Sequence, residues 1–169
     1  MKTKIKAKKT AYEYGIYLLK FCNRSEAEII KRLQEKSYSR RDITQALFKL
    51  KKYKLLDEET AVQLIISSRI HKNLSNQAVR AELLHKGYPI DIIEKHINVS
   101  LEETFPETSR ALNLAEHMLL KLPACSDEKK LYSLQRLLLR KGFTYEIVEE
   151  IKSKLKKRNG DTPLRGMSK

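Results

Sequence analysis

Hydrophobic residues recur along this chain at intervals of three and four, which is the spacing of one face of an α-helix. The stripe is clearest in three separate segments, with Ile29 and Leu33 in the first, Val79 and Leu83 in the second, and Leu131, Leu134 and Leu138 in the third. Polar and charged residues fill the positions between them, and the 169 residues include only five glycines and four prolines. The pattern predicts an all-α protein.

The same three segments form an internal repeat. Each copy carries a leucine, then a lysine, a small residue and an aromatic residue, and five positions later a β-branched residue. The matched sets are Leu33, Lys36, Ser37, Tyr38 and Ile43; Leu83, Lys86, Gly87, Tyr88 and Ile93; and Leu138, Lys141, Gly142, Phe143 and Val148. The second set follows the first by 50 residues and the third follows the second by 55, which predicts a surface-loop insertion in the third copy.

Each copy is predicted to contain three helices. The expected helices are 9–22, 26–36 and 40–52; 58–72, 76–86 and 90–98; and 107–121, 127–141 and 145–157. Ser25, with Glu28 three residues later, predicts a capping box for the second helix. The expected organisation is a basic N-terminal arm (1–8), three repeats (9–56, 57–104 and 105–157) and a flexible basic tail (158–169). Three stacked units predict an elongated, curved body.

The small residue after each second helix has a structural role. Glycine just past a helix end adopts the left-handed conformation that closes the helix, and the following aromatic residue folds back onto the core. Tyr38 and Tyr88 are therefore expected in the core. Ser37 replaces the glycine in the first repeat, so the turn there is expected to be strained or different.

The net charge of +14 is unevenly distributed. Residues 1–9 carry +5, residues 10–56 carry +6 and residues 152–169 carry +6, whereas residues 57–104 carry −3 and residues 105–151 are neutral. A basic excess at both ends points to nucleic acid or another polyanion as a partner. Solubility alone is the alternative explanation.

Basic residues on the first and third repeats are the candidates for contact with nucleic acid: Arg24, Lys31, Arg32, Arg40, Arg41, Lys51, Lys52, Arg136, Arg140 and Lys141. Repeated cations on helical faces neutralise phosphates without reading sequence. A solvated face is the alternative, supported by helical pairs such as Glu28–Arg32. Tyr12, Tyr14 and Tyr17 crowd one predicted helix and at least one is expected to be exposed, although base stacking is not favoured.

Catalytic and cofactor motifs are absent from the sequence, so no enzyme activity, metal or cofactor is expected. The four histidines lie on separate predicted helices without ligand spacing, and the widely separated Cys22 and Cys125 suit a reducing cytoplasm. No apolar run approaches the roughly 20 residues that cross a bilayer. The basic start is similar to a signal peptide, but Glu13 and Lys20 interrupt its apolar segment, so cytoplasmic localisation is expected.

The middle copy carries a family resemblance. The segment LLDEETAVQLIISSRIHKNLSNQAVRAELLHKGYPIDIIEKHI (55–97) has Leu56 before three acidic residues, Ser68-Arg69, Val79-Arg80, Glu82-Leu83, Lys86-Gly87 and Ile93 in order. It resembles the RecX family of bacterial recombination regulators, and the likeness extends over residues 11–155, including RKGFTYEIVEEI (140–151). The chain departs from the family at Thr60, where arginine is usual, and near Ala61 and Ile65, where aromatic residues are usual.

The resemblance implies a regulator that binds RecA, lies in the groove of its filament on single-stranded DNA, and limits its recombinase, ATPase and co-protease activities in DNA repair and the SOS response. Single-stranded DNA is expected to bind weakly and without sequence preference, and the protein is expected to be a monomer that does not bind membranes. The alternative is a general, non-catalytic helical nucleic-acid-binding protein.

Arg69, Arg80 and Lys86 are the candidate RecA-binding residues. They are basic residues on an otherwise acidic repeat, and the two arginines match basic positions of the family pattern. Both arginines flank the predicted buried stripe and are expected to reach solvent. The structural alternative is an internal ion pair, for example between Arg80 and a nearby glutamate.

Overall fold

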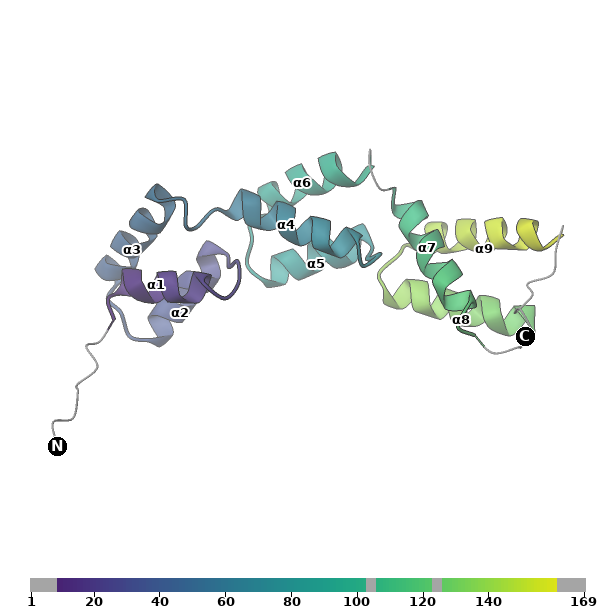
Figure 1. The fold of residues 1–169 in the computed structure, drawn as a ribbon, viewed down its shortest axis with the longest axis horizontal. Helices are drawn as coiled ribbons and strands as arrows, with labels where there is room; N and C mark the ends of the chain where they lie inside the picture. The colour runs from purple at the N-terminus through teal and green to yellow at the C-terminus, as the bar shows by residue number, and fades with distance from the viewer. Residues whose placement is uncertain (1–8, 103–105, 123–125, 161–169) are drawn as a thin grey trace, which may run out of the picture. The chain divides into compact units, whose positions relative to one another are not determined.

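The computed structural model describes residues 9–102, 106–122 and 126–160. Within these ranges the chain forms nine α-helices and no β-strand (Figure 1). They are α1 (Ala11–Leu19), α2 (Glu26–Glu35), α3 (Arg40–Lys52), α4 (Glu58–Ile70), α5 (Asn76–His85), α6 (Ile90–Glu102), α7 (Glu107–Leu119), α8 (Asp127–Arg140) and α9 (Tyr145–Gly160). The predicted all-α class is confirmed.

Helix α9 extends beyond its predicted end at residue 157. It continues to Gly160, so the first three residues of the predicted tail are helical. The predicted arm (1–8) and the rest of the tail (161–169) lie outside the described residues.

The chain divides into two compact units. One contains residues 1–64 and 83–93, and the other contains residues 65–82 and 94–169. The division passes through the middle repeat, so the predicted repeat boundaries are not the boundaries of the compact units. In the first unit α1, α2 and α3 enclose a core of aliphatic residues. In the second unit α7, α8 and α9 enclose another.

The predicted hydrophobic stripes lie in the interior except at Leu131, which is only partly buried. Ile29, Leu33, Val79, Leu83, Leu134 and Leu138 each have 0% of their surface exposed. Tyr88 is 3% exposed, as expected for a core aromatic residue, whereas Tyr38 is only partly buried against the first core. Burying one such aliphatic side chain contributes about 1.5–3 kcal/mol, so these stripes are the main source of stability.

All three repeats close their second helix with the same left-handed turn. The φ angles are 60° at Ser37, 78° at Gly87 and 85° at Gly142. In each turn the next amide donates to the carbonyl five residues earlier, as Tyr38 N does to Leu33 O at 3.2 Å. Ser37 therefore adopts the glycine-like conformation despite its Cβ, so of the two predicted alternatives the turn is strained and not different in form.

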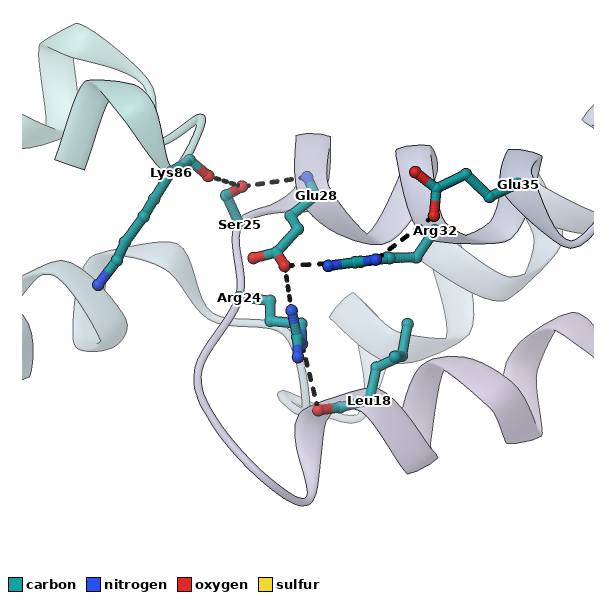
Figure 2. A network of polar contacts seen from close by, with 7 residues as sticks. All are labelled: Leu18, Arg24, Ser25, Glu28, Arg32, Glu35 and Lys86. Atoms are coloured by element: carbon teal, nitrogen blue, oxygen red, sulfur yellow. Dashed lines mark hydrogen bonds and ion pairs between the residues drawn. The ribbon is translucent and has the colours of Figure 1, made fainter. Parts of the chain in front are cut away.

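The first compact unit contains a joint between the first repeat and the turn that follows α5. Ser25 Oγ accepts a hydrogen bond from Glu28 N at 3.1 Å and donates one to Lys86 O at 2.5 Å (Figure 2). Glu58 Oε1 accepts from Glu26 N at 2.9 Å, so α4 supplies a second cap for α2. A Cβ added at Gly87 would lie 3.2 Å from Ser25 Oγ. We call this contact, made by Ser25, Glu58 and Gly87, the first joint.

The second compact unit contains an equivalent joint. Ser75 Oγ accepts from Ala78 N at 3.0 Å, and Glu107 Oε1 accepts from Asn76 N at 2.9 Å. A Cβ added at Gly142 would lie 2.6 Å from Ser75 Oγ, so the turn after α8 packs directly on the start of α5. Ser75, Glu107 and Gly142 form the second joint. The helix N-terminus, the glutamate and the glycine turn thus recur in the same arrangement.

Arg110 adds a polar clamp to the second joint. This α7 residue is 1% exposed, and its guanidinium donates to Leu74 O and to Asn76 Oδ1. Burial lowers the pKa of Arg110, an effect that Glu107 opposes. The guanidinium therefore ties the segment before α5 to α7.

Candidate nucleic-acid and partner-binding residues

Two of the candidate arginines of the first repeat are engaged in a polar network (Figure 2). Arg24 Nη1 donates to Glu28 Oε1, and its Nε donates to Leu18 O at 3.4 Å. Arg32 lies 3.8 Å from Glu28 Oε1 and 3.4 Å from Glu35 Oε2. Arg24 thus ties the end of α1 to α2. The predicted capping box is only half formed, because Ser25 caps α2 while the Glu28 carboxylate binds these arginines.

Four other candidates on the first repeat form no ion pair within the described part of the chain: Lys31, Arg40, Arg41 and Lys52. All four side chains are exposed. Helix α3 has one acidic residue, Asp42, whose carboxylate accepts from Ser39 Oγ at 2.7 Å at the helix start. The exposed side of α3 therefore keeps an uncompensated positive charge, as contact with phosphates requires.

Lys51 differs from its neighbour Lys52, because its Nζ lies 2.6 Å from Glu26 Oε2. We expect Lys52→Gln to reduce the slope of log affinity for single-stranded DNA against log salt concentration by about 0.7, the value for one phosphate contact. Lys51→Gln, the matched control, should change the slope less because Glu26 already compensates its charge. Fluorescence anisotropy titrations at several salt concentrations measure both. Equal slopes for Lys52→Gln and the unmodified protein would show that Lys52 does not meet a phosphate.

The candidates of the third repeat lie near a hollow between α7 and α8. Arg136 and Arg140 line this hollow, of about 560 Å³, together with Met118, Ser133, Leu137 and Leu139. The Arg136 guanidinium lies 6.0 Å from the centre of the Tyr132 ring, the outer limit of a cation–π contact. Lys141 is half-buried at the end of α8. This group is also basic.

The two candidate arginines of the middle repeat form bidentate internal ion pairs. Arg69 Nε and Nη2 each donate to Glu82 at 2.6 Å. Arg80 Nε and Nη2 donate to Glu94 at 2.5 Å and 2.9 Å. These hydrogen bonds raise the pKa of both arginines, and Arg80 lowers the pKa of Glu94. Within the chain both arginines therefore form internal ion pairs, which was the alternative to a partner contact. Their contact with a partner stays a prediction.

Lys86, the third partner candidate, belongs to the first joint. Its carbonyl accepts from Ser25 (Figure 2), and its side chain is half-buried. The backbone at Lys86 thus has a structural function that the sequence pattern did not reveal. Its contact with RecA also stays a prediction.

An aromatic row on the first repeat was not predicted as a unit. The ring centres of Tyr38 and Tyr14 lie 6.2 Å apart, those of Tyr14 and Tyr17 6.0 Å, and those of Tyr17 and Phe21 5.1 Å. Tyr17 is 42% exposed and Phe21 72% exposed, which confirms that one of the clustered tyrosines reaches solvent. Tyr14, Tyr17 and Phe21 have the three- and four-residue spacing of one helical face, and this spacing was the available signal.

Other kinds of site find no support in the described ranges. No group of three or more His, Cys, Asp or Glu residues there has the geometry to hold a metal ion. No helix among those residues has the length and apolar character to span a membrane. Cys22 is exposed, and Cys125 lies outside the described residues.

Comparison with known families identifies relatives of the first repeat and of most of the chain. A family model described as the first three-helix domain of RecX matches residues 11–50. The regulatory protein RecX of Clostridium botulinum is 30% identical over 130 residues, which are 76% of this chain and 60% of that protein. The regulatory protein RecX of Geobacillus thermodenitrificans is 31% identical over 144 residues, which are 83% of this chain and 52% of that protein. The aligned regions thus cover between half and two thirds of these two relatives.

Solved structures share the fold. A crystal structure of RecX from Lactobacillus salivarius superposes with a TM-score of 0.73 at 19% identity, covering 86% of this chain and 94% of that one. A second crystal structure, of a regulatory protein RecX, gives a TM-score of 0.70 at 22% identity and covers 85% of this chain and 71% of that one. At this level of identity the two structures support the helical repeat fold.

Proposed function

This chain belongs to the RecX family, and we propose that it is a non-catalytic regulator that binds RecA and its filament on single-stranded DNA. In this proposal it mainly inhibits the recombinase, ATPase and co-protease activities of RecA during DNA repair and the SOS response. It acts as a monomer in the bacterial cytoplasm. The observation that carries the proposal is the similarity of 76–83% of the chain to proteins named regulatory protein RecX.

The distribution of charge supports contact with DNA inside the filament. Exposed cations of α3 supply a positive surface, whereas the arginines of the middle repeat are neutralised by glutamates. Phosphates therefore meet α3 before the middle repeat, because uncompensated cations bind them most strongly. The middle repeat, with paired charges, suits a protein surface better than a phosphate backbone.

The decisive experiment follows ATP hydrolysis by RecA on single-stranded DNA while the protein is added. A filament regulator should inhibit hydrolysis at concentrations well below those that coat the DNA. A general nucleic-acid-binding protein, the second candidate, should inhibit only near saturation of the DNA by competing for it. Inhibition that appears only at saturation would therefore refute the proposal.

The ion pair between Arg80 and Glu94 allows a test of the partner surface. If Arg80 contacts RecA, Arg80→Gln should raise the half-inhibitory concentration about tenfold, as for a charge-assisted hydrogen bond. Glu94→Gln, which leaves the guanidinium without its carboxylate, should lower it. ATP hydrolysis by RecA gives both values.

Thermal unfolding of the two variants provides the control. Because both side chains are about one-third exposed, loss of the pair should cost no more than about 1 kcal/mol of stability. Shifts of inhibition in the same direction for both variants would assign Arg80 a structural function only.

A further inference from the structure

We propose that the aromatic row formed by Tyr38, Tyr14, Tyr17 and Phe21 is a stacking surface for the bases of single-stranded DNA. The inference builds on the DNA contact in the proposed function and adds the surface and the mode of binding. The row runs from the partly buried Tyr38 to the exposed Phe21, with successive ring centres 5.1–6.2 Å apart. Its exposed end has ring surface in contact with water.

The rings of the row are held in place by contacts with one another and with the core. Tyr14 and Tyr17 are stacked with 23° between their planes, and Phe21 meets Tyr17 edge-on at 74°. At the inner end the Tyr38 hydroxyl donates to Lys9 O at 2.6 Å, and Tyr38 packs against the core. Because the inner rings are anchored, the outer rings lose little side-chain entropy when a ligand binds, as an effective stacking surface requires.

The charge around the row indicates which ligand it binds. Lys9 Nζ lies 4.0 Å from the centre of the Tyr17 ring, and residues 1–9 contain five lysines and no acidic residue. The acidic residue of α1, Glu13, is engaged at the helix start, where its carboxylate accepts from Thr10 N at 2.8 Å. Exposed aromatic rings with the Lys9 ammonium group beside them match a strand that offers bases and phosphates together.

Lys9 also suggests how the row changes on binding. A cation over an exposed ring interacts more weakly than a stacked base does. A base that stacks on Tyr17 therefore displaces the ammonium group, which then lies within reach of the adjacent phosphate. The same lysine thus covers the ring in the free protein and neutralises the DNA backbone in the complex.

The test compares two labelled oligonucleotides, oligothymidylate and an abasic strand of the same length, in anisotropy titrations with the full chain and without RecA. The unmodified protein should bind oligothymidylate about 5- to 150-fold more tightly, the range expected for stacking of one base. The double variant Tyr17→Leu with Phe21→Leu should bind both strands with similar affinity. The salt dependence should be unchanged, because no charge is removed.

Phe48→Leu is the matched control, since Phe48 is 67% exposed on α3 of the same repeat but does not belong to the row. It should keep the preference for oligothymidylate. Equal binding of the two strands by the unmodified protein, or equal losses in the control and the double variant, would overturn the proposal without affecting inhibition of RecA. A double variant that keeps the preference but no longer inhibits RecA would show that the row binds protein instead.

Discussion

Replacing Gly142 with alanine should destabilise the second compact unit by about 2–4 kcal/mol, combining backbone strain with steric overlap. The φ of 85° is unfavourable for a residue with a Cβ. The new methyl group would also lie 2.6 Å from Ser75 Oγ and 3.2 Å from Ala78 Cβ. Neither neighbour moves easily, because Ser75 caps α5 and Ala78 lies in its first turn. Urea denaturation followed by circular dichroism measures the loss.

A second substitution separates the two causes. Ser75→Gly removes the hydroxyl that the methyl group meets, and glycine at an N-cap costs only a few tenths of a kcal/mol. In that background Gly142→Ala should cost about 1–2 kcal/mol, which is the backbone strain together with the remaining contact with Ala78 Cβ. An equal cost in both backgrounds would mean that the turn does not press on Ser75.

Replacing Arg110 with alanine should destabilise the same unit by about 3 kcal/mol, since it opens a cavity and leaves two acceptors without their donor. Leu74 O and Asn76 Oδ1 are the acceptors, and the arginine side chain is buried. Arg110→Met fills most of the space but donates no hydrogen bond, so its loss should be roughly half as large. Chemical denaturation of the three proteins gives both differences.

Arg41 is the control for the removal of a positive charge. It is exposed on α3 and pairs with no acidic residue in the described ranges, so Arg41→Ala should change stability by less than about 0.5 kcal/mol. If Arg110→Met were as stable as the unmodified protein, the burial of the guanidinium would cost as much as its hydrogen bonds contribute.

The sequence predicted the helices and their buried stripes well because both depend on local spacing. Leu33 and Leu83 follow Ile29 and Val79 by four residues, and both pairs are buried. The left-handed turn at Ser37 could also be predicted from the sequence, because its glycine counterparts occupy the same place in the repeat.

Contacts between residues far apart in the sequence could not be predicted in the same way. Glu26 and Glu58 are 32 residues apart, and Arg110 and Leu74 are 36 apart, so no periodicity relates them. For the candidate site, composition gave the number of cations but not which of them pair with glutamates. Lys51 and Lys52 are adjacent and chemically identical, yet only Lys51 has a carboxylate partner in the described residues.

The joints also bear on how an array of this kind could grow. Each joint inserts the glycine turn of a later repeat, as a plug, into the helix N-terminus of an earlier repeat, as a socket. The first repeat has Ser37 at its turn, whose Cβ occupies the space that a plug leaves empty. In the third repeat α8 begins earlier than its counterparts, so Lys130, which is aligned with the capping serines Ser25 and Ser75, lies inside the helix, and its N donates to Ser126 O at 3.1 Å. The first repeat is therefore a poor plug, and the third has no serine at the socket position, so a second copy gains little by joining head to tail through this contact.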